Sequence, residues 1–191
     1  MSITDDKAAL RREMMASRDA LGPTERKLSA LGIATVGLPE GIADKPCIVS
    51  SYWAIGAELD MTALGRRLGT EGHQVCLPCI QGKAEPMLFR LWKHGDQMRE
   101  RKWGIMEPVD AAPAVDPDIL LVPLLAWDAN GYRLGYGGGY YDRTIQALRR
   151  RKPVVVVGVA YDEQKVDAVP RLDYDERLDW MLTPSGAIRF A

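Results

Sequence analysis

The stretch VPLLAWDANGYRLGYGGGYYD, residues 122–142, decides the fold of this chain and is its most informative segment. It begins inside the apolar run 119–123, which is short enough to be a β-strand covered on both faces. It then enters a glycine cluster and runs into residues 140–151, which we predict to be a helix. A buried strand followed by a glycine-rich turn and a helix is typical of a phosphate site in an α/β protein.

Apolar runs on both sides of this stretch alternate with helical patterns. Further strands are predicted at residues 47–53, 74–77, 87–92, 154–161 and 178–182. Further helices are predicted from Thr4 to Gly22, from Thr24 to Gly37, and over 59–68. This alternation predicts one α/β domain over residues 1–191, with a three-layer, Rossmann-like arrangement: a mostly parallel sheet with helices on both faces.

Composition narrows the functional classes. The 191 residues are 47% hydrophobic, and 25 Lys and Arg against 26 Asp and Glu give a formal net charge of −1. That balance shows no general attraction to nucleic acid or to an anionic membrane. No apolar run reaches the length of a membrane span, and the acidic N-terminus carries no apolar signal region. With an odd number of cysteines, three, we expect a cytoplasmic protein without a disulfide framework.

The glycine cluster has the chemistry of an anion-binding loop. Glycines at 135, 137, 138 and 139 are expected to allow positive φ and a close approach of the backbone to a ligand. Arg133 offers a planar cation to phosphate oxygens, and Asp142 falls in the first helical turn, where it could hold a phosphate-bound metal ion. The loop lacks the Lys-Ser/Thr ending of a P-loop and the spacing of the dinucleotide fingerprint, so an ordinary tight turn remains the alternative.

A basic stripe near the N-terminus supplies further cations. Lys7 and Arg11 are four residues apart on the first predicted helix and therefore share a face, and Arg18 continues the stripe. They could converge on one anion. The alternative is a solvated basic face.

The string RLGYGGGYYD, preceded by VPLLAWD, resembles the signature of the 5-formyltetrahydrofolate cyclo-ligase family. The resemblance extends along the chain in the family's order, through Lys7-x-x-Leu10-Arg11, SYWAIGAELD at 51–60, VCLP at 75–78, WGIMEP at 103–108 and LDWMLT at 178–183. It implies an ATP- and Mg²⁺-dependent enzyme that closes 5-formyltetrahydrofolate to 5,10-methenyltetrahydrofolate. In that reaction the γ-phosphoryl group of ATP goes to the formyl oxygen, the neighbouring nitrogen closes the ring, and phosphate leaves with ADP.

The resemblance also implies residue roles. The expected ATP contacts are Lys7, Arg11, Arg133, Leu134, Gly135, Tyr136, Gly137, Gly138, Gly139, Tyr140 and Tyr141. The expected reduced-folate contacts are Trp53, Glu58, Tyr136, Gly137, Gly138, Gly139 and Tyr140. Arg133 and Tyr141 are the expected catalytic residues, and Asp142 and Asp175 the expected magnesium ligands. Glu58 could accept hydrogen bonds from pterin N–H groups, although a surface Glu near a helix start is the commoner case.

Three positions depart from the family pattern, and one of them, Trp127 in place of the usual Phe, is expected to change only packing. The family often has Lys where this chain has Gly138, and Tyr174 stands where the family has His or Asn before the late Asp. Asp173 and Asp179 are therefore rivals to Asp175 as the second metal ligand. Trp103 joins Trp53 as a pocket candidate.

Three features have ordinary explanations or leave alternatives open. Cys76 and Cys79 form a C-x-x-C pair that we assign to the buried core rather than to redox or metal chemistry. A monomer is expected, with a weak dimer as the alternative. The competing functions are a non-catalytic reduced-folate or nucleotide-binding protein and an enzyme similar to sugar-phosphate isomerases or CoA transferases.

From the sequence, Asp142→Asn is expected to lower turnover with little effect on thermal stability.

Overall fold

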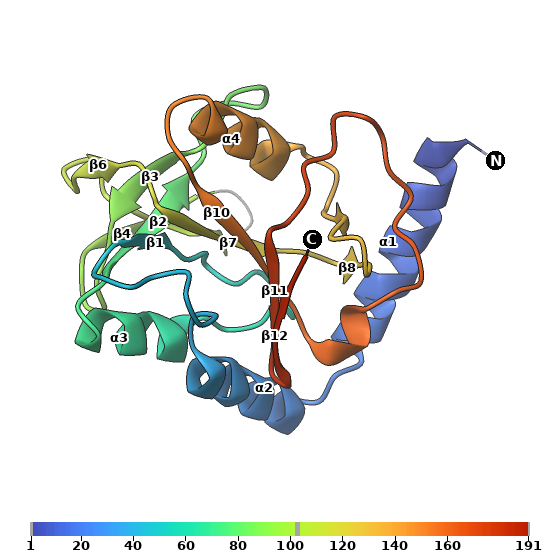
Figure 1. Ribbon diagram of the computed structural model, residues 1–191, viewed down its shortest axis with the longest axis horizontal. Coiled ribbons are helices and arrows are strands. Elements are labelled where there is room, and N and C mark those ends of the chain that lie inside the picture. The colour runs from blue at the N-terminus through green and yellow to red at the C-terminus, as the bar shows by residue number, and fades with distance from the viewer. Residues whose placement is uncertain (1, 102–103, 191) are drawn as a thin grey trace.

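A computed structural model describes residues 2–101 and 104–190. Its centre is one eight-stranded mixed sheet with the strand order β12-β11-β10-β7-β1-β2-β3-β6, and helices lie on both sides of it (Figure 1). The middle of the sheet consists of five parallel strands: β11 (Trp180–Thr183), β10 (Val155–Val159), β7 (Ile119–Pro123), β1 (Ile48–Ser50) and β2 (Gln74–Cys79). The α/β class is therefore confirmed.

The edges of the sheet are antiparallel, so the prediction of a mostly parallel sheet holds only for its centre. Antiparallel pairing adds β3 (Leu88–Leu91) and then β6 (Ala114–Val115) at one edge, and β12 (Gly186–Arg189) at the other. Only two residues separate β11 from β12, which permits a hairpin but not the long crossover that parallel pairing needs. Neither β12 nor β6 was predicted from the sequence.

The helices begin close to the predicted positions. They are α1 (Ile3–Asp19), α2 (Pro23–Val36), α3 (Thr62–Thr70) and α4 (Tyr140–Arg149), with a 3₁₀ turn η2 at Asp162–Gln164. Helix α1 begins earlier than predicted because Ser2 and Asp5 form a capping box. Helix α3 begins later, at Thr62, whose N–H donates to Asp60 Oδ1 at 2.8 Å.

Two hydrophobic clusters fill the two faces of the sheet because successive residues of a strand point to opposite sides. Leu121 of β7 belongs to the cluster that contains Ile33 of α2 and Leu64 of α3. Its neighbour Leu120 belongs to the other cluster, with Ile145 of α4. Figure 1 shows α2 and α3 below the sheet and α4 above it.

Helix α1 lies apart from these layers, beside a small hairpin (Figure 1). The hairpin pairs β8 (Ala126–Trp127) with β9 (Arg133–Leu134), and a second ribbon pairs β4 (Met98–Glu100) with β5 (Met106–Pro108). Met14 of α1 packs with Leu125 and Leu134 in a third cluster. The hairpin turn is fixed by buried Asp128, whose carboxylate accepts from the N–H groups of Asn130, Tyr132 and Val169 at 2.9–3.1 Å.

Two further sequence predictions can be compared with the structure. Cys76 and Cys79 are buried in β2, as predicted for core cysteines, and burial raises the pKa of both thiols, that of Cys79 to about 11. Within residues 2–101 and 104–190, no helix is both long and apolar enough to cross a membrane.

The tight packing of β10 gives a test of the fold. A Cβ atom at Gly158 would lie 2.6–2.9 Å from the ends of Leu178, Leu124 and Met181, all buried. We expect Gly158→Ala to lower the free energy of unfolding by about 1–3 kcal/mol, measured by chemical denaturation, because three core side chains must shift together. Gly69→Ala, at an exposed position of α3 with nothing within 4 Å, is the matched control and should be neutral or stabilising by up to about 1 kcal/mol. Equal stability of the two variants would contradict this account of the core.

Candidate functional site

The candidate site lies at the carboxyl edge of the parallel strands, where α/β sheets bind their ligands. Residues 51–58 follow β1, Tyr161 follows β10, and the β8–β9 hairpin with the glycine loop follows β7. The topology thus brings the glycine loop and Glu58, which are far apart in the sequence, to the same edge of the sheet.

The glycine loop leads directly into α4. Gly137 has φ 94°, and Gly139, the N-cap of α4, has φ 65° in the left-handed region. No side chain among the described residues caps this helix, so its first-turn N–H groups can face an anion. The expectation of positive φ was wrong for Gly135 and Gly138. At Gly138 the reason for glycine is the Tyr140 ring, which a Cβ would approach to 2.8 Å.

Arg133 is buried on β9 and joins three segments. Its Nη2 donates to Asp142 Oδ1 at 2.7 Å, at the start of α4. Its Nη1 donates to the carbonyl oxygen of Glu176, whose own N–H donates to the same Asp142 oxygen at 3.2 Å. The carboxylate of Asp142 therefore balances a cation that is almost out of contact with water, since only 5% of the Arg133 side chain is exposed.

One face of α1 carries three cations to the glycine loop and to the late acidic segment. Lys7 Nζ pairs with Asp175, Arg11 Nε donates to the Gly135 carbonyl oxygen at 2.9 Å, and Arg18 Nη2 donates to the Tyr136 hydroxyl. Lys7 is 8% exposed and Arg18 is 4% exposed. The alternative of a solvated basic face is therefore wrong for this stripe.

The three candidate aspartates of the late segment have different surroundings. Asp175 accepts from Lys7 and from the N–H of Leu172. Asp173 is exposed, and Asp179 accepts from the N–H of Val156 at 2.7 Å and from Arg149 at 3.2 Å. Of these three, Asp175 is the one that contacts a cation of the basic stripe. Asp179 is instead hydrogen-bonded to the backbone of β10.

Asp142 and Asp175 each use one oxygen and leave the other available. Both hydrogen bonds to Asp142 go to Oδ1, and both to Asp175 go to Oδ2. The remaining oxygens accept none from the residues that the structure describes, and one or two carboxylates beside phosphate oxygens suit Mg²⁺. In the same described part of the chain, no three His, Cys, Asp or Glu side chains gather as a complete metal cage.

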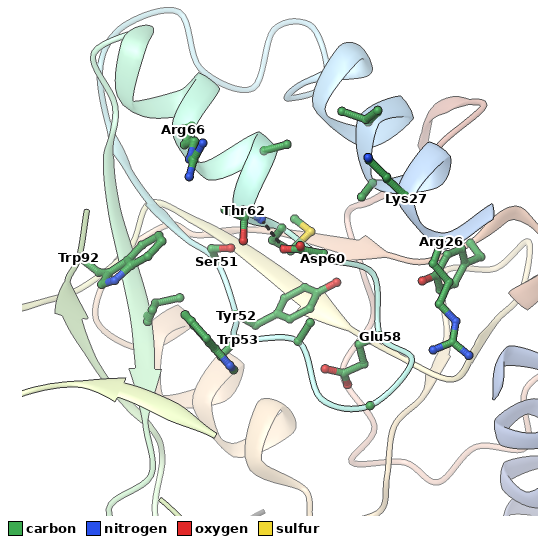
Figure 2. A pocket seen from close by; sticks show the side chains of 18 residues that line it. Arg26, Lys27, Ser51, Tyr52, Trp53, Glu58, Asp60, Thr62, Arg66 and Trp92 are labelled. Carbon is green, nitrogen blue, oxygen red and sulfur yellow. Dashed lines mark hydrogen bonds between the residues drawn. The ribbon is translucent and has the colours of Figure 1, made fainter. Parts of the chain in front are cut away.

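A cavity of about 820 Å³ opens between the loop after β1 and the helices α2 and α3. Figure 2 shows Trp53 and Glu58 projecting from that loop, with Lys27 reaching in from α2 and Arg66 from α3. Of the residues expected to contact reduced folate, Trp53 and Glu58 line this pocket, whereas Tyr136, Gly137, Gly138, Gly139 and Tyr140 are not among its lining residues. Trp53 is 38% exposed and offers a flat apolar face to a ligand. Trp103, the other pocket candidate, lies outside the described residues.

Glu58 is a buried carboxylate with an incomplete set of partners. It is 7% exposed, and its Oε2 accepts from the N–H of Ile55 at 2.8 Å. Burial raises its pKa, while the Ile55 N–H, the Arg18 charge and the Tyr136 hydroxyl act in the opposite direction. Its Oε1 accepts no hydrogen bond from the residues that the structure describes. The commoner reading of Glu58 as a surface residue is wrong.

The aromatic residues around the loop are arranged differently from one another. Tyr136 is 46% exposed, and Tyr140 lies under Arg143, 5.2 Å from guanidinium carbon to ring centroid. Tyr141 packs against the cluster on the α4 side of the sheet, and burial, with a contribution from Glu58, keeps the pKa of its hydroxyl far above the usual range. Tyr141 can therefore donate a hydrogen bond but does not act as a base. The Leu134 side chain lies in the core, which leaves only its backbone to face a ligand.

Several residues of this site were not assigned a role from the sequence. Arg18 contacts Tyr136, and its place on the stripe of Lys7 and Arg11 was the available signal. The pocket-lining cations Arg26, Lys27 and Arg66 belong to no motif, and only the folded chain brings them together.

Fold and site together define an α/β protein with a glycine-rich loop before α4 and a large pocket at the same edge of its sheet. The model of the 5-formyltetrahydrofolate cyclo-ligase family matches residues 3–184, so the chain belongs to this family. It is 34% identical to the 5-formyltetrahydrofolate cyclo-ligase of Escherichia coli K12 over 142 residues, which cover 72% of this chain and 78% of that protein. It is 28% identical to the enzyme of that name from Mycolicibacterium smegmatis over 190 residues, 95% of each chain.

A solved structure supports the same relationship. The NMR structure of Aquifex aeolicus 5,10-methenyltetrahydrofolate synthetase matches 96% of this chain and 92% of its own, with a TM-score of 0.77 and 30% identity. The resemblance found in the glycine loop is thus confirmed over nearly the whole chain.

The Arg133–Asp142 pair changes one expectation drawn from the sequence. Asp142→Asn removes the negative charge beside a buried guanidinium, and we now expect a loss of about 1–3 kcal/mol in the free energy of unfolding. Thermal and chemical denaturation measure this loss. Asp173→Asn, at an exposed position, is the control and should change stability by less than about 0.5 kcal/mol. Unchanged stability of Asp142→Asn would show that the pair contributes nothing to the fold.

Proposed function

We propose that this chain catalyses the ATP-dependent cyclisation of 5-formyltetrahydrofolate to 5,10-methenyltetrahydrofolate, with release of ADP and phosphate. One observation carries the proposal beyond family membership. The anion-binding loop and the pocket that contains Glu58 and Trp53 lie at the same edge of the sheet, and Tyr136 of the loop is near Glu58. A phosphoryl donor and a pterin could therefore meet there.

The nucleotide side consists of the glycine loop and the basic stripe. Three kinds of group here can stabilise the negative charge of a triphosphate: the open N–H groups at the start of α4, the Arg11 guanidinium and the Lys7 ammonium. We assign the ATP contacts to Lys7, Arg11 and the residues from Arg133 to Tyr141, with Leu134 contributing only through its backbone. These groups neutralise charge on the phosphates and hold the transferred group in line.

Magnesium, when bound, would neutralise phosphate charge in the transferred group. We assign its protein ligands to Asp142 and Asp175 because each carboxylate has one oxygen that accepts no hydrogen bond from the described residues. Their other oxygens remain held by Arg133 and Lys7, which fixes the orientation of both carboxylates.

The folate side consists of Glu58, Trp53 and the exposed loop tyrosine. The free oxygen of Glu58 can accept from pterin N–H groups, and Trp53 can stack on the ring. Arg133 stabilises negative charge on the transferred group, and the Tyr141 hydroxyl, which stays protonated, acts as a donor. Ring closure by the substrate's own nitrogen needs no protein nucleophile.

The remaining expectations are part of this proposal. We further propose a cytoplasmic monomer and a single cyclo-ligase-like domain over residues 1–191. Helices on both faces of the parallel centre support a three-layer, Rossmann-like classification. A protein that binds reduced folate without turnover is the competing function. Family membership argues against a sugar-phosphate isomerase or a CoA transferase.

Dependence on both ATP and Mg²⁺ is the first functional test. We expect the purified protein to form methenyl product, followed by its ultraviolet absorbance, and to release ADP in step with product when 5-formyltetrahydrofolate is supplied with ATP and Mg²⁺. Omitting ATP, or chelating Mg²⁺, should abolish the signal. Binding of folate without product or ADP would identify the competing sequestering function, and product at full rate without ATP would overturn the mechanism.

Arg11 provides a residue-level test of the nucleotide side. Arg11→Ala removes a charge-assisted donor worth about 1.5–3 kcal/mol, so the KM for ATP should rise by roughly 10-fold to 150-fold. Arg12→Ala, at the exposed neighbouring position, is the matched control and should leave this KM within about twofold. Equal kinetics for the two variants would remove Arg11 from the ATP site.

A further inference from the structure

Arg18 is a buried cation on α1 that holds an exposed tyrosine of the glycine loop. Its Nη2 donates to the Tyr136 hydroxyl, and its guanidinium carbon lies 5.5 Å from the centroid of the same ring. Arg18 is 4% exposed, whereas Tyr136 is 46% exposed. One side of the tyrosine is thus fixed to α1 while the other side remains open to a ligand.

The positive charge of Arg18 also lowers the pKa of Glu58. The titratable neighbours coupled to Glu58 include four tyrosines: Tyr52 after β1, Tyr136 on the loop, Tyr141 on α4 and Tyr161 after β10. Burial raises the pKa of each of these hydroxyls, so all four are uncharged at neutral pH. Charged side chains also line the pocket with Glu58, namely Arg26 and Lys27 of α2, Asp60, and Arg66 of α3, but none of them shifts its pKa. Among residues 2–101 and 104–190, Arg18 is therefore the charged side chain that lowers the pKa of Glu58.

Both members of this cluster have polar atoms without partners. Arg18 Nε and Glu58 Oε1 are buried and make no hydrogen bond with any described residue. A buried donor and a buried acceptor in one cluster are unfavourable for stability, which points to a functional reason for keeping them. Glu58 lines the large pocket, whereas Arg18 is not among the lining residues, so Arg18 acts on a ligand through its neighbours.

We propose that Arg18 is a positioning residue that supplies the countercharge for Glu58 in the folate pocket and ties Tyr136 to that carboxylate. This inference rests on the proposed function, because it takes the pterin of 5-formyltetrahydrofolate as the partner of Glu58. The charged carboxylate accepts strong hydrogen bonds from the amino and ring N–H groups of a pterin, and the protonated form accepts weaker ones. The positive charge of Arg18 keeps this ionised, accepting form of Glu58 present.

The direction of the pH effect follows from these contacts. Burial raises the pKa of Glu58, and the Arg18 charge opposes that rise. Without the charge of Arg18 the pKa rises further, so Glu58 takes up a proton at a higher pH. Folate affinity should then begin to fall at a higher pH as the solution is acidified.

The test measures binding of 5-formyltetrahydrofolate by titration calorimetry between about pH 8 and pH 5.5, without ATP. Arg18→Gln removes the charge, Arg18→Lys restores it, and Arg12→Gln makes the same charge change at an exposed position of the same helix. Circular dichroism and thermal melting verify that each variant is folded. If Arg18→Gln does not fold, Arg18→Met replaces it, because an apolar side chain of similar length brings no unpaired polar atom of its own into the buried position.

We expect the loss of affinity on acidification to be at least about tenfold larger for Arg18→Gln than for the wild type, the factor that corresponds to one unit of pKa. Arg18→Lys should recover most of this difference, and Arg12→Gln should follow the wild-type curve. A pH profile of Arg18→Gln, or of Arg18→Met, that coincides with the wild-type profile would overturn the inference while leaving the proposed function intact. Absence of folate binding by the wild type would overturn the proposed function itself.

Discussion

The arrangement of the site depends on the pairing of the buried Arg133 guanidinium. A charge this far from water must be paired, and its partners come from two segments beyond its own hairpin: the start of α4 and the backbone before β11. Removing any one of these segments would cost each of the other two one of its partners. The glycine loop is consequently held at both ends, by Arg133 on the strand side and by Asp142 on the helix side, while its middle remains exposed.

The local patterns of the sequence predicted the centre of the molecule well. The run 119–123 is a strand with the predicted bounds, and α4 begins at Tyr140 as expected. Such segments are decided by nearby residues: a continuous apolar run for a strand buried on two faces, and a glycine before a helix. The antiparallel strands β6 and β12 were not predicted because they are short and take their pairing from distant neighbours, which no local pattern encodes.

The candidate site was predicted unevenly for the same reason. Motif residues such as Glu58 and Asp175 fall where their expected roles are physically reasonable, although their burial and ion pairs could not be read from the chain. Spacing placed Arg18 on the right face of α1 but could not distinguish a solvated cation from one 4% exposed, since burial depends on the loop that packs over it. The cations of α2 and α3 that line the pocket were missed because they carry no motif and are joined only by tertiary contacts.

In this structure the cations expected to bind phosphate are already paired with the carboxylates expected to bind the metal. Lys7 holds Asp175 and Arg133 holds Asp142, so the positive and negative groups neutralise one another. Isolated charges at these depths would be costly to desolvate, and mutual pairing avoids that cost. A triphosphate with its metal ion carries charges of both signs. Its anionic oxygens can pair with Lys7 and Arg133, and its metal ion can pair with the carboxylates of Asp175 and Asp142. Such a ligand can therefore enter by extending the existing pairs into an alternating network, without leaving a buried charge uncompensated. A nucleotide without a metal ion would supply partners for the two cations but none for the two carboxylates. This gives a physical reason for the site to favour nucleotide and metal together.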